Sequence, residues 1–391
     1  PFFDSMNIQC LRCKGRGFCG RSFCPIIAKS KARTPVKDIL KEDFASQSPS
    51  PFIGREGYPY INVGFLAPPE KKEDIDRYDA PREWADKELE IKNIIDMRSS
   101  LINSRVKSGI LESNRIVDMA KEIALSQKAP DVEVNLKNKP AYALSLDPQI
   151  TPMGPRAEIR KAQITENTKI PRKVEEAVDD DDYKANNAVI DLYKRGLDEN
   201  YLSKILSVGT IGRKKDRKLV PTRWSITAVD DNLGKDKIQK VKEHRHAEHT
   251  AYFGGYLGNY YLVLLFPEPW SYELFEAYLP RSSWNTSEEI QFMTDYEPFG
   301  GRKSYAENCA GGYYAARLPI LEKLEDMKRQ ASVLALRFIT GEYTSPLGVW
   351  VCREATRKSL GSRPIEFADR ELMLKYAKSL VKKKFGYDLD N

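Results

Sequence analysis

The segment YYLVLLF, Tyr260–Phe266, decides the fold, because an uninterrupted run of apolar and aromatic residues predicts a buried strand. After a short connection, WSYELFEAYL at Trp270–Leu279 alternates between polar and apolar residues, as a second strand should. Connections this short favour an antiparallel or mixed sheet. The sequence therefore predicts a sheet at the centre of the carboxy-terminal half.

The segments around this sheet predict further strands and helices. Trp224–Val229 (WSITAV) and Leu347–Cys352 (LGVWVC) read as additional strands. Pro319 is expected to begin an amphipathic helix, and residues 364–384 a basic one. No G-x-G-x-x-G or Walker sequence occurs where a doubly wound sheet would place one. We therefore expect an α+β fold with an antiparallel or mixed sheet and flanking helices.

The first half combines helical periodicity with shorter strands. Residues 81–106 and 115–124 read as helices, and residues 131–140 as a strand. Between Phe52 and Pro68, three glycines surround Arg55. Either these glycines form turns between short strands, or they let the backbone approach a phosphate closely.

Four cysteines lie within fifteen residues, in the segment CLRCKGRGFCGRSFC. Cys10 and Cys13 have the spacing of a zinc knuckle, and Cys19 and Cys24 follow after short loops. We expect one tetrahedral, structural Zn²⁺ site, since a chain of this size builds a core without disulfides and carries no secretion signal. Such a closed site has no position for a reacting water.

Positive charge is concentrated around this expected zinc module. Residues 1–33 contain seven basic residues and one acidic residue, which is most of the formal net charge of +7. Residues 353–384 carry ten basic and four acidic residues, and Gly212–Lys218 is a third basic patch. Such surfaces suit the phosphates of nucleic acid, although solvated basic faces are also common. DNA is therefore one expected partner and RNA another.

Length and composition bound the remaining possibilities. The 391 residues suggest a zinc module at 1–33, a mainly helical region with short strands at 34–210 and an α+β domain at 211–391. No apolar run is long enough to cross a membrane. We expect a cytoplasmic protein in which Cys309 and Cys352 are buried thiols.

Several long blocks of the sequence resemble the archaeal Nre family of DNA-repair proteins. The blocks are LVPTRWSITAVDD (219–231), GNYYLVLLFP (258–267), GRKSYAENCAGGYYAARL (301–318) and PLGVWVCREATR (346–357), with the cysteine cluster, FIGREGYPYINVG (52–64) and RSSL (98–101) as further matches. The resemblance implies an amino-terminal zinc region, repair of damaged DNA and association with the replication sliding clamp. Family members typically end in a clamp-binding peptide with a glutamine and a terminal aromatic residue, whereas this chain ends KKKFGYDLDN.

Candidate site residues cluster in or beside these blocks. The carboxylates Asp230 and Asp231 are expected at a strand end, where they would activate water against a glycosidic or phosphate bond. Candidate nucleotide or DNA contacts are Arg98, Arg223, Arg302, Tyr305, Tyr313, Tyr314, Arg317 and Arg353. The tyrosines would stack on an extruded base and the arginines would bind phosphate. The alternative is a buried ion-pair network with core tyrosines under the sheet.

Three functions therefore remain open. The first is a DNA-glycosylase-like hydrolase that removes damaged bases and has a nucleotide-sized pocket, where a nucleotide would bind, in its carboxy-terminal half. The second is a non-enzymatic repair scaffold recruited to the sliding clamp, and the third is an RNA-binding zinc protein.

Overall fold

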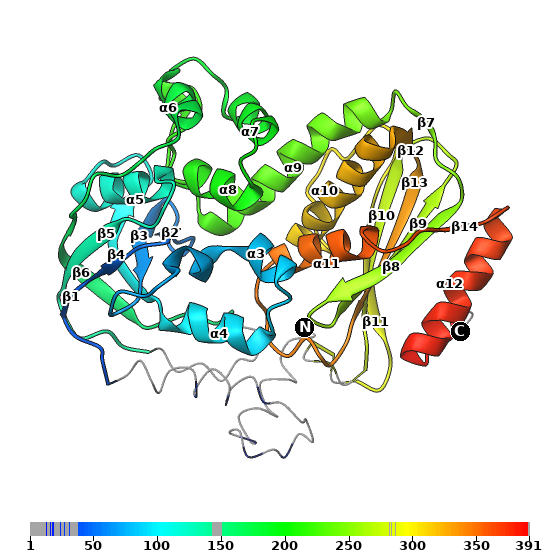
Figure 1. The fold of residues 1–391 in the computed structure, drawn as a ribbon, viewed down its shortest axis with the longest axis horizontal. Helices are drawn as coiled ribbons and strands as arrows, with labels where there is room; N and C mark the ends of the chain where they lie inside the picture. Colours follow the sequence, from blue (N-terminus) through cyan, green and yellow to red (C-terminus); the bar gives the residue numbers. More distant parts are fainter. Residues whose placement is uncertain are drawn as a thin grey trace. The chain divides into compact units, whose positions relative to one another are not determined.

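The computed structural model describes residues 38–142, 151–280, 282, 284, 285 and 287–389, together with Cys13, Arg16, Phe18, Cys24, Ile27 and Lys31. Two compact units divide the chain. Unit 1 is Pro1–Asn232 with Thr344–Pro346, and unit 2 is Leu233–Tyr343 with Leu347–Asn391. Figure 1 labels the helices and strands of both units.

Unit 1 is built on a mixed sheet of six strands in the order β1-β5-β6-β4-β3-β2. Its neighbouring strands are antiparallel except for β4 and β6, which are parallel. The strands are β1 (Asp43–Gln47), β2 (Ser50–Ile53), β3 (Tyr60–Ala67), β4 (Ile102–Gly109), β5 (Asp131–Leu136) and β6 (Arg156–Ile164). The helical elements are η1 (Ile75–Asp79), α3 (Pro81–Asp86), α4 (Ile91–Ser100), α5 (Arg115–Leu125), α6 (Arg172–Asp179), α7 (Ala185–Lys194), α8 (Glu199–Ser207), η2 (Lys214–Asp216) and the start of α9 (Thr222–Val241).

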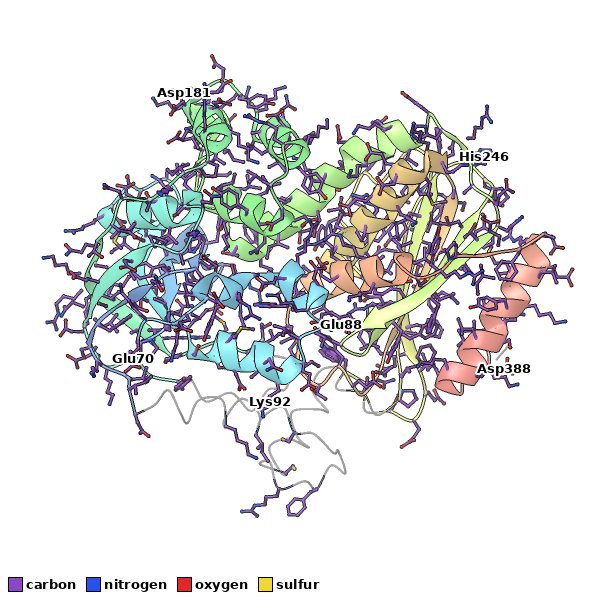
Figure 2. The ribbon with its side chains drawn as sticks, viewed as in Figure 1. Glu70, Glu88, Lys92, Asp181, His246 and Asp388 are labelled. Carbon is purple, nitrogen blue, oxygen red and sulfur yellow. The ribbon has the colours of Figure 1, made fainter. Side chains whose placement is uncertain are left out.

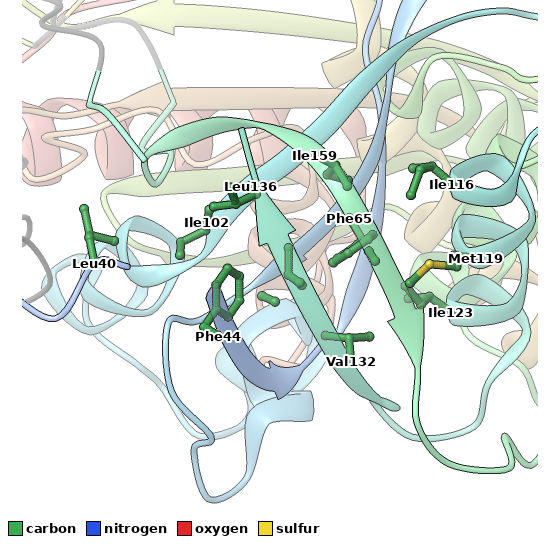
Figure 3. Packing of buried hydrophobic residues seen from close by; sticks show 13 residues of the cluster. Leu40, Phe44, Phe65, Ile102, Ile116, Met119, Ile123, Val132, Leu136 and Ile159 are labelled. Atoms are coloured by element: carbon green, nitrogen blue, oxygen red, sulfur yellow. The ribbon is translucent and has the colours of Figure 1, made fainter. Parts of the chain in front are cut away.

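The core of unit 1 lies between one face of this sheet and α5. Alternate residues of β3, from Ile61 to Ala67, are fully buried, because the pleat sends every second side chain to the same face. Ile116, Met119 and Ile123 of α5 pack on the sheet at helical spacing (Figure 3). Asn114 caps this helix by accepting bonds from the amides of Ile116 and Val117.

Unit 2 contains a second mixed sheet of six strands, in the order β11-β10-β13-β9-β8-β14. Only β10 and β13 pair in parallel within it, and β7 and β12 form a separate pair. The strands are β7 (Arg245–His246), β8 (Thr250–Tyr256), β9 (Asn259–Phe266), β10 (Ser271–Tyr278), β11 (Gln291–Glu297), β12 (Arg329–Gln330), β13 (Ser332–Ile339) and β14 (Ile365–Glu366). The helices are the end of α9, α10 (Ala310–Met327), α11 (Trp350–Leu360) and α12 (Arg370–Phe385).

Helices cover both faces of this second sheet (Figure 1). Met373, Ala377 and Val381 of α12 pack against Leu262 and Leu264 of β9. Tyr261 and Val263, which point to the opposite face, are also fully buried, on the side where α10 and α11 lie. The predicted buried strand at Tyr260–Phe266 is therefore confirmed, and the α+β fold with mixed sheets and flanking helices is confirmed with it.

Two predicted strands are wrong, because the first segment is helical and the second is a turn that runs into a helix. Trp224–Val229 lies in α9, where Ser225, Val229 and Leu233 are buried at intervals of four residues. Leu347–Cys352 leads into α11, which buries Val351 and Ala355 at the same spacing. Both segments are rich in aromatic and β-branched residues, but that preference is weak and packing against neighbouring elements overrides it.

The helix expected to begin at Pro319 begins at Ala310 instead, with Pro319 inside it. Its residues from Gly311 to Leu321 are buried on all sides, so this half shows no amphipathic pattern. The expected helix at 81–106 is two helices, α3 and α4, followed by β4. In the described residues, no helix has both the length and the apolarity needed to cross a bilayer.

Candidate functional site

Five predicted contact residues come together in unit 2, between the end of β11 and the first half of α10. We call Arg302, Tyr305, Tyr313, Tyr314 and Arg317 the arginine–tyrosine cluster. The loop after β11 supplies the first two residues, and successive turns of α10 supply the other three. The loop and the helix that follows it thus bring these five side chains to one place.

Arg317 is the buried centre of this cluster. Its Nη1 lies 2.6 Å from Oε2 of Glu297, the last residue of β11. The other carboxylate oxygen of Glu297 accepts a hydrogen bond of 3.2 Å from Nε1 of Trp270. The guanidinium carbon lies 5.6 Å from the ring centre of Tyr313 and 5.3 Å from that of Tyr314. These contacts satisfy a charge that would otherwise be costly to bury.

A glycine on α9 makes room for this guanidinium. A Cβ built on Gly234 would stand 3.1 Å from Nη2 of Arg317, which is tighter than an ordinary contact. Glycine at this position lets α9 pass directly over the charged group.

Arg302 and Tyr305 form the outer edge of the cluster, where Arg302 is half-buried and Tyr305 is exposed. Nη2 of Arg302 lies 3.1 Å from Oδ1 of Asp295, and its Nη1 donates to the carbonyl oxygen of Tyr296. Tyr305 is 50% exposed and stacks on Tyr314, with ring centres 5.4 Å apart. Tyr305 therefore offers a ring to solvent.

Tyr313 and Tyr314 are core residues, 0% and 5% exposed. The phenol of Tyr314 accepts a hydrogen bond from the amide of Ala306. Burial, and then the nearby charge of Glu297, raises the pKa of Tyr313 above its ordinary value, so its phenol stays protonated. Sequence analysis left two roles open for these residues: nucleotide contacts, or a buried ion-pair network with core tyrosines. The positions of Tyr313, Tyr314 and Arg317 agree with the second role. Their role as nucleotide contacts stays a prediction.

The two candidate catalytic carboxylates lie in the middle of α9, so their expected place at a strand end is wrong. Asp230 is fully buried and Asp231 is half-buried. Successive residues of a helix point about 100° apart, so the two carboxylates face different surroundings. The two residues were proposed as catalytic because functional groups often lie at strand ends, and that reason therefore does not apply.

Arg98 and Arg353 are held by carboxylates of their own units. Arg98 on α4 lies 2.6 Å from Asp79, which also contacts Lys204 at 3.0 Å. Burial raises the pKa of Asp79, but Lys204 and Arg98 outweigh it and leave the pKa below its ordinary value. Arg353 on α11 is 4% exposed, with its Nε 3.6 Å from Glu354. Both arginines stabilise the fold in this structure.

The expected zinc ligands are only partly within the described residues. Cys13 is buried and Cys24 is half-buried, while Cys10 and Cys19 lie outside the described part. Among the residues that the structure describes, no group of three histidine, cysteine or acidic side chains is arranged to hold a metal ion. Cys309 and Cys352 are buried as expected, and burial raises the pKa of both thiols.

The basic patches differ in how far their charges are compensated. In Gly212–Lys218, Arg213 pairs with Asp216, while Lys214 and Arg217 approach Asp181 at 3.3 and 3.5 Å. Asp181 follows α6 and is labelled in Figure 2. The helix α12 buries one face and exposes a row of basic residues on the other: Lys375, Lys378, Lys382, Lys383 and Lys384. Lys382 pairs with Asp388 at 2.8 Å.

Arg223, a predicted contact, belongs to an exposed group whose aromatic members, Trp224 and Tyr58, were missed by sequence reasoning. Arg223 lies at the start of α9 beside Trp224, whose ring centre is 5.2 Å from that of Tyr58. Trp224 is 46% exposed and Tyr58 is 42% exposed. Because Trp224–Val229 was predicted as a strand, Trp224 was not considered as an exposed residue. The adjacent arginine and tryptophan at positions 223 and 224 were the signal in the sequence.

Comparison with known proteins identifies similar sequences along most of the chain. The family described as "Archaeal Nre, N-terminal" matches residues 18–285, and "Archaeal Nre, C-terminal" matches residues 297–388. A protein of Haloferax volcanii named DNA repair protein NreA is 37% identical over 340 residues, covering 84% of this chain and 80% of the relative. Two proteins of Archaeoglobus fulgidus, named DNA repair proteins NreB and NreA, are 35% and 36% identical, covering 94% and 97% of this chain and 92% and 95% of the relatives. No solved structure matches the chain.

Proposed function

The chain belongs to the archaeal Nre family, and on this premise we propose that it is a DNA-repair protein. The observation that carries the proposal is the extent of the similarity, because relatives named DNA repair proteins align with up to 97% of the chain. We further propose that the protein binds DNA through basic surfaces and a structural zinc module.

The exposed face of α12 supports the proposed DNA contact. Asp369 caps this helix, and Met373, Ala377 and Val381 fix one side of it on the sheet. The lysines on the other side are therefore presented to solvent from a rigid support. Cations held in this way attract phosphates and release the counterions that surround DNA.

The proposed zinc module would present a second positive surface. Its ligands would be Cys10, Cys13, Cys19 and Cys24, whose thiolates suit a tetrahedral Zn²⁺ site. Four thiolates and one divalent ion together remove two charges, which leaves residues 1–33 positive. This zinc would stabilise the segment and would not take part in a reaction.

If the protein also removes damaged bases, Asp231 and Asp230 are the candidate catalytic residues. Base removal requires a carboxylate that reaches a water beside the sugar, and Asp231 is the more accessible of the two. The burial of Asp230, Tyr313 and Arg317 favours the second candidate, a repair scaffold without catalysis. Such a scaffold would hold repair partners on DNA, and the sliding clamp would be one of them.

One experiment separates these versions. Zinc-loaded protein is incubated with duplexes that each carry one deaminated, oxidised or alkylated base, and released bases and nicks are measured. Base release that is lost in Asp231→Asn or Asp230→Asn, but kept in the control Asp236→Asn on the same helix, supports the enzyme. Binding without conversion of any lesion supports the scaffold. A preference for structured RNA at matched salt would contradict DNA as the substrate.

A further inference from the structure

An exposed group of aromatic and basic side chains lies on unit 1. In the sequence these residues are separate from the expected zinc ligands and from α12. We call Arg55, Tyr58, Tyr60, Lys107, Arg223 and Trp224 the aromatic–cation surface. Its three rings are exposed: Tyr58 is 42%, Tyr60 64% and Trp224 46% accessible to solvent. Single exposed rings need no explanation, but here two of them, Tyr58 and Trp224, are in contact beside basic side chains.

Hydrogen bonds between neighbouring elements hold the parts of this surface together. The amide of Ile53 donates to Oγ1 of Thr222 at 3.2 Å, which ties the end of β2 to the first turn of α9. The amide of Ile110 donates to the carbonyl of Pro59 at 3.1 Å, and Tyr60 pairs with Gly109 across β3 and β4. The tyrosines and the tryptophan are therefore presented by rigid backbone.

The turn between β2 and β3 brings Tyr58 toward α9. Gly57 has a φ of 83°, a conformation that side-chain-bearing residues rarely adopt, and the amide of Tyr60 donates to its carbonyl. The rings of Tyr58 and Trp224 meet at an angle of 51°, so they do not stack flat on one another. Each ring can therefore offer a face to a planar group.

The charges around the rings are mainly positive. Arg55, Lys107 and Arg223 are exposed, and the Nζ of Lys107 lies 3.6 Å from where a Cβ on Gly57 would stand. Burial, and then the charge of Arg156, lowers the pKa of Arg105, which lies opposite Gly64 on the neighbouring strand. Two carboxylates oppose part of this positive charge. Glu56 lies on the turn between β2 and β3, and Glu112 accepts a hydrogen bond from the amide of Gly109, the residue opposite Tyr60. The surface therefore attracts an anion that also carries planar groups.

We infer that the aromatic–cation surface binds unpaired nucleotides of single-stranded DNA, with bases stacked on Trp224, Tyr58 and Tyr60 and phosphates beside Arg223, Lys107 and Arg55. Single-stranded DNA suits both the aromatic and the basic side chains of the surface. Its bases are free to stack on the rings, and its phosphate backbone is a regular polyanion that the cations attract. A duplex hides its base faces and would use only the cations. The inference rests on the proposed DNA-repair function and names the form of DNA that this surface takes.

Trp224 itself provides the readout. The other four tryptophans are buried or half-buried, so an emission change on binding that is lost in Trp224→Phe reports on this surface. The protein is titrated with a fluorescently labelled oligothymidylate of fifteen nucleotides and with a duplex of fifteen base pairs. We expect the single strand to bind more tightly and to quench Trp224.

Substitutions test the individual contacts. Trp224→Ala, Tyr58→Ala and Tyr60→Ala should each weaken oligothymidylate binding about tenfold, since stacking on one base is worth roughly 1–3 kcal/mol. Phe292→Ala is the matched control, because Phe292 is 64% exposed on β11 of the other unit. Arg223→Gln should lower the dependence of log Kd on log salt by about one. Circular dichroism establishes that each variant is folded.

The outcomes separate the two proposals. If the wild-type protein binds neither single strand nor duplex at low salt, the proposed function fails and this inference fails with it. If it binds DNA but the three aromatic variants bind oligothymidylate as the wild type does, the function stands and the inference is overturned. Tighter binding of oligouridylate than of oligothymidylate would overturn it in favour of RNA.

Discussion

Arg317 and Glu297 form an ion pair that is almost completely withdrawn from water. Nη1 of the arginine lies 2.6 Å from Oε2 of the glutamate, and the two side chains are 2% and 0% exposed. One residue comes from α10 and the other from the end of β11, so the pair fastens the helix to the sheet of unit 2. Nε1 of Trp270 donates a hydrogen bond to the second carboxylate oxygen of Glu297.

We expect Arg317→Met to lower the free energy of unfolding of unit 2 by about 3–5 kcal/mol, because the change leaves the charge of Glu297 buried without its partner. Adding Glu297→Gln should recover part of this loss, since glutamine keeps an acceptor for Trp270. Urea unfolding followed by tryptophan fluorescence measures both variants. Equal stability of Arg317→Met and wild type would contradict a buried pair.

Metal content tests the zinc module directly. We expect about one Zn²⁺ per chain by elemental analysis, and loss of that zinc in Cys13→Ser and Cys24→Ser. Cys352→Ser is the matched control, because Cys352 is buried in unit 2 and should leave the zinc content unchanged. Zinc should also be released as the pH falls, because the ligands are thiolates. Full zinc in Cys13→Ser would argue against this ligand set.

The buried carboxylate of Asp79 should make unit 1 sensitive to acid. Burial raises its pKa, but Lys204 and Arg98 lower it more, so the folded pKa lies below the unfolded value of about 3.9. The stabilisation is therefore complete above about pH 5, and it is lost progressively as the pH falls through the unfolded pKa and then the lowered folded pKa. We expect Asp79→Asn to be less stable than wild type near neutral pH and to show a flatter dependence of thermal midpoint on pH below 4. The same acid dependence in both proteins would contradict this assignment.

The lysines of α12 should contribute to DNA affinity through charge alone. Lys375→Gln combined with Lys383→Gln should reduce the slope of log Kd against log salt by about two, whatever the DNA sequence. Lys92→Gln with Lys161→Gln removes two exposed charges from unit 1 as a control. An equal change of slope in both double variants would mean that α12 has no special role.

Tyr305 is the most exposed side chain of the arginine–tyrosine cluster. If an adenine nucleotide stacks there, Tyr305→Ala should weaken its binding about tenfold, while Tyr305→Phe should bind as the wild type does, since stacking uses the ring. Isothermal titration with ATP and with ADP measures the affinity. Tyr296→Ala is the control, because Tyr296 is 51% exposed on β11. Unchanged affinity in Tyr305→Ala would leave the cluster with a structural role.

The sequence by itself determined the fold class and the family. The run Tyr260–Phe266 is buried on both faces, and a continuous apolar run is the pattern that such a strand requires. The helix at Arg115–Leu125 was likewise predictable, because its buried residues recur at helical spacing. The long blocks at 219–231 and 301–318 were enough to indicate the Nre family. These features are local, so one stretch of sequence contains all the information that specifies them.

Only the tertiary structure decided which candidate residues are buried and which are exposed. Trp224 and Asp230 belong to one helix, yet the tryptophan is 46% exposed and the aspartate 0%. From the sequence, Arg317 could be a nucleotide contact or part of a buried ion-pair network, and in the structure it pairs with Glu297 in the core. The sequence could not decide this, because the burial of a charge depends on a partner that arrives from a distant part of the chain.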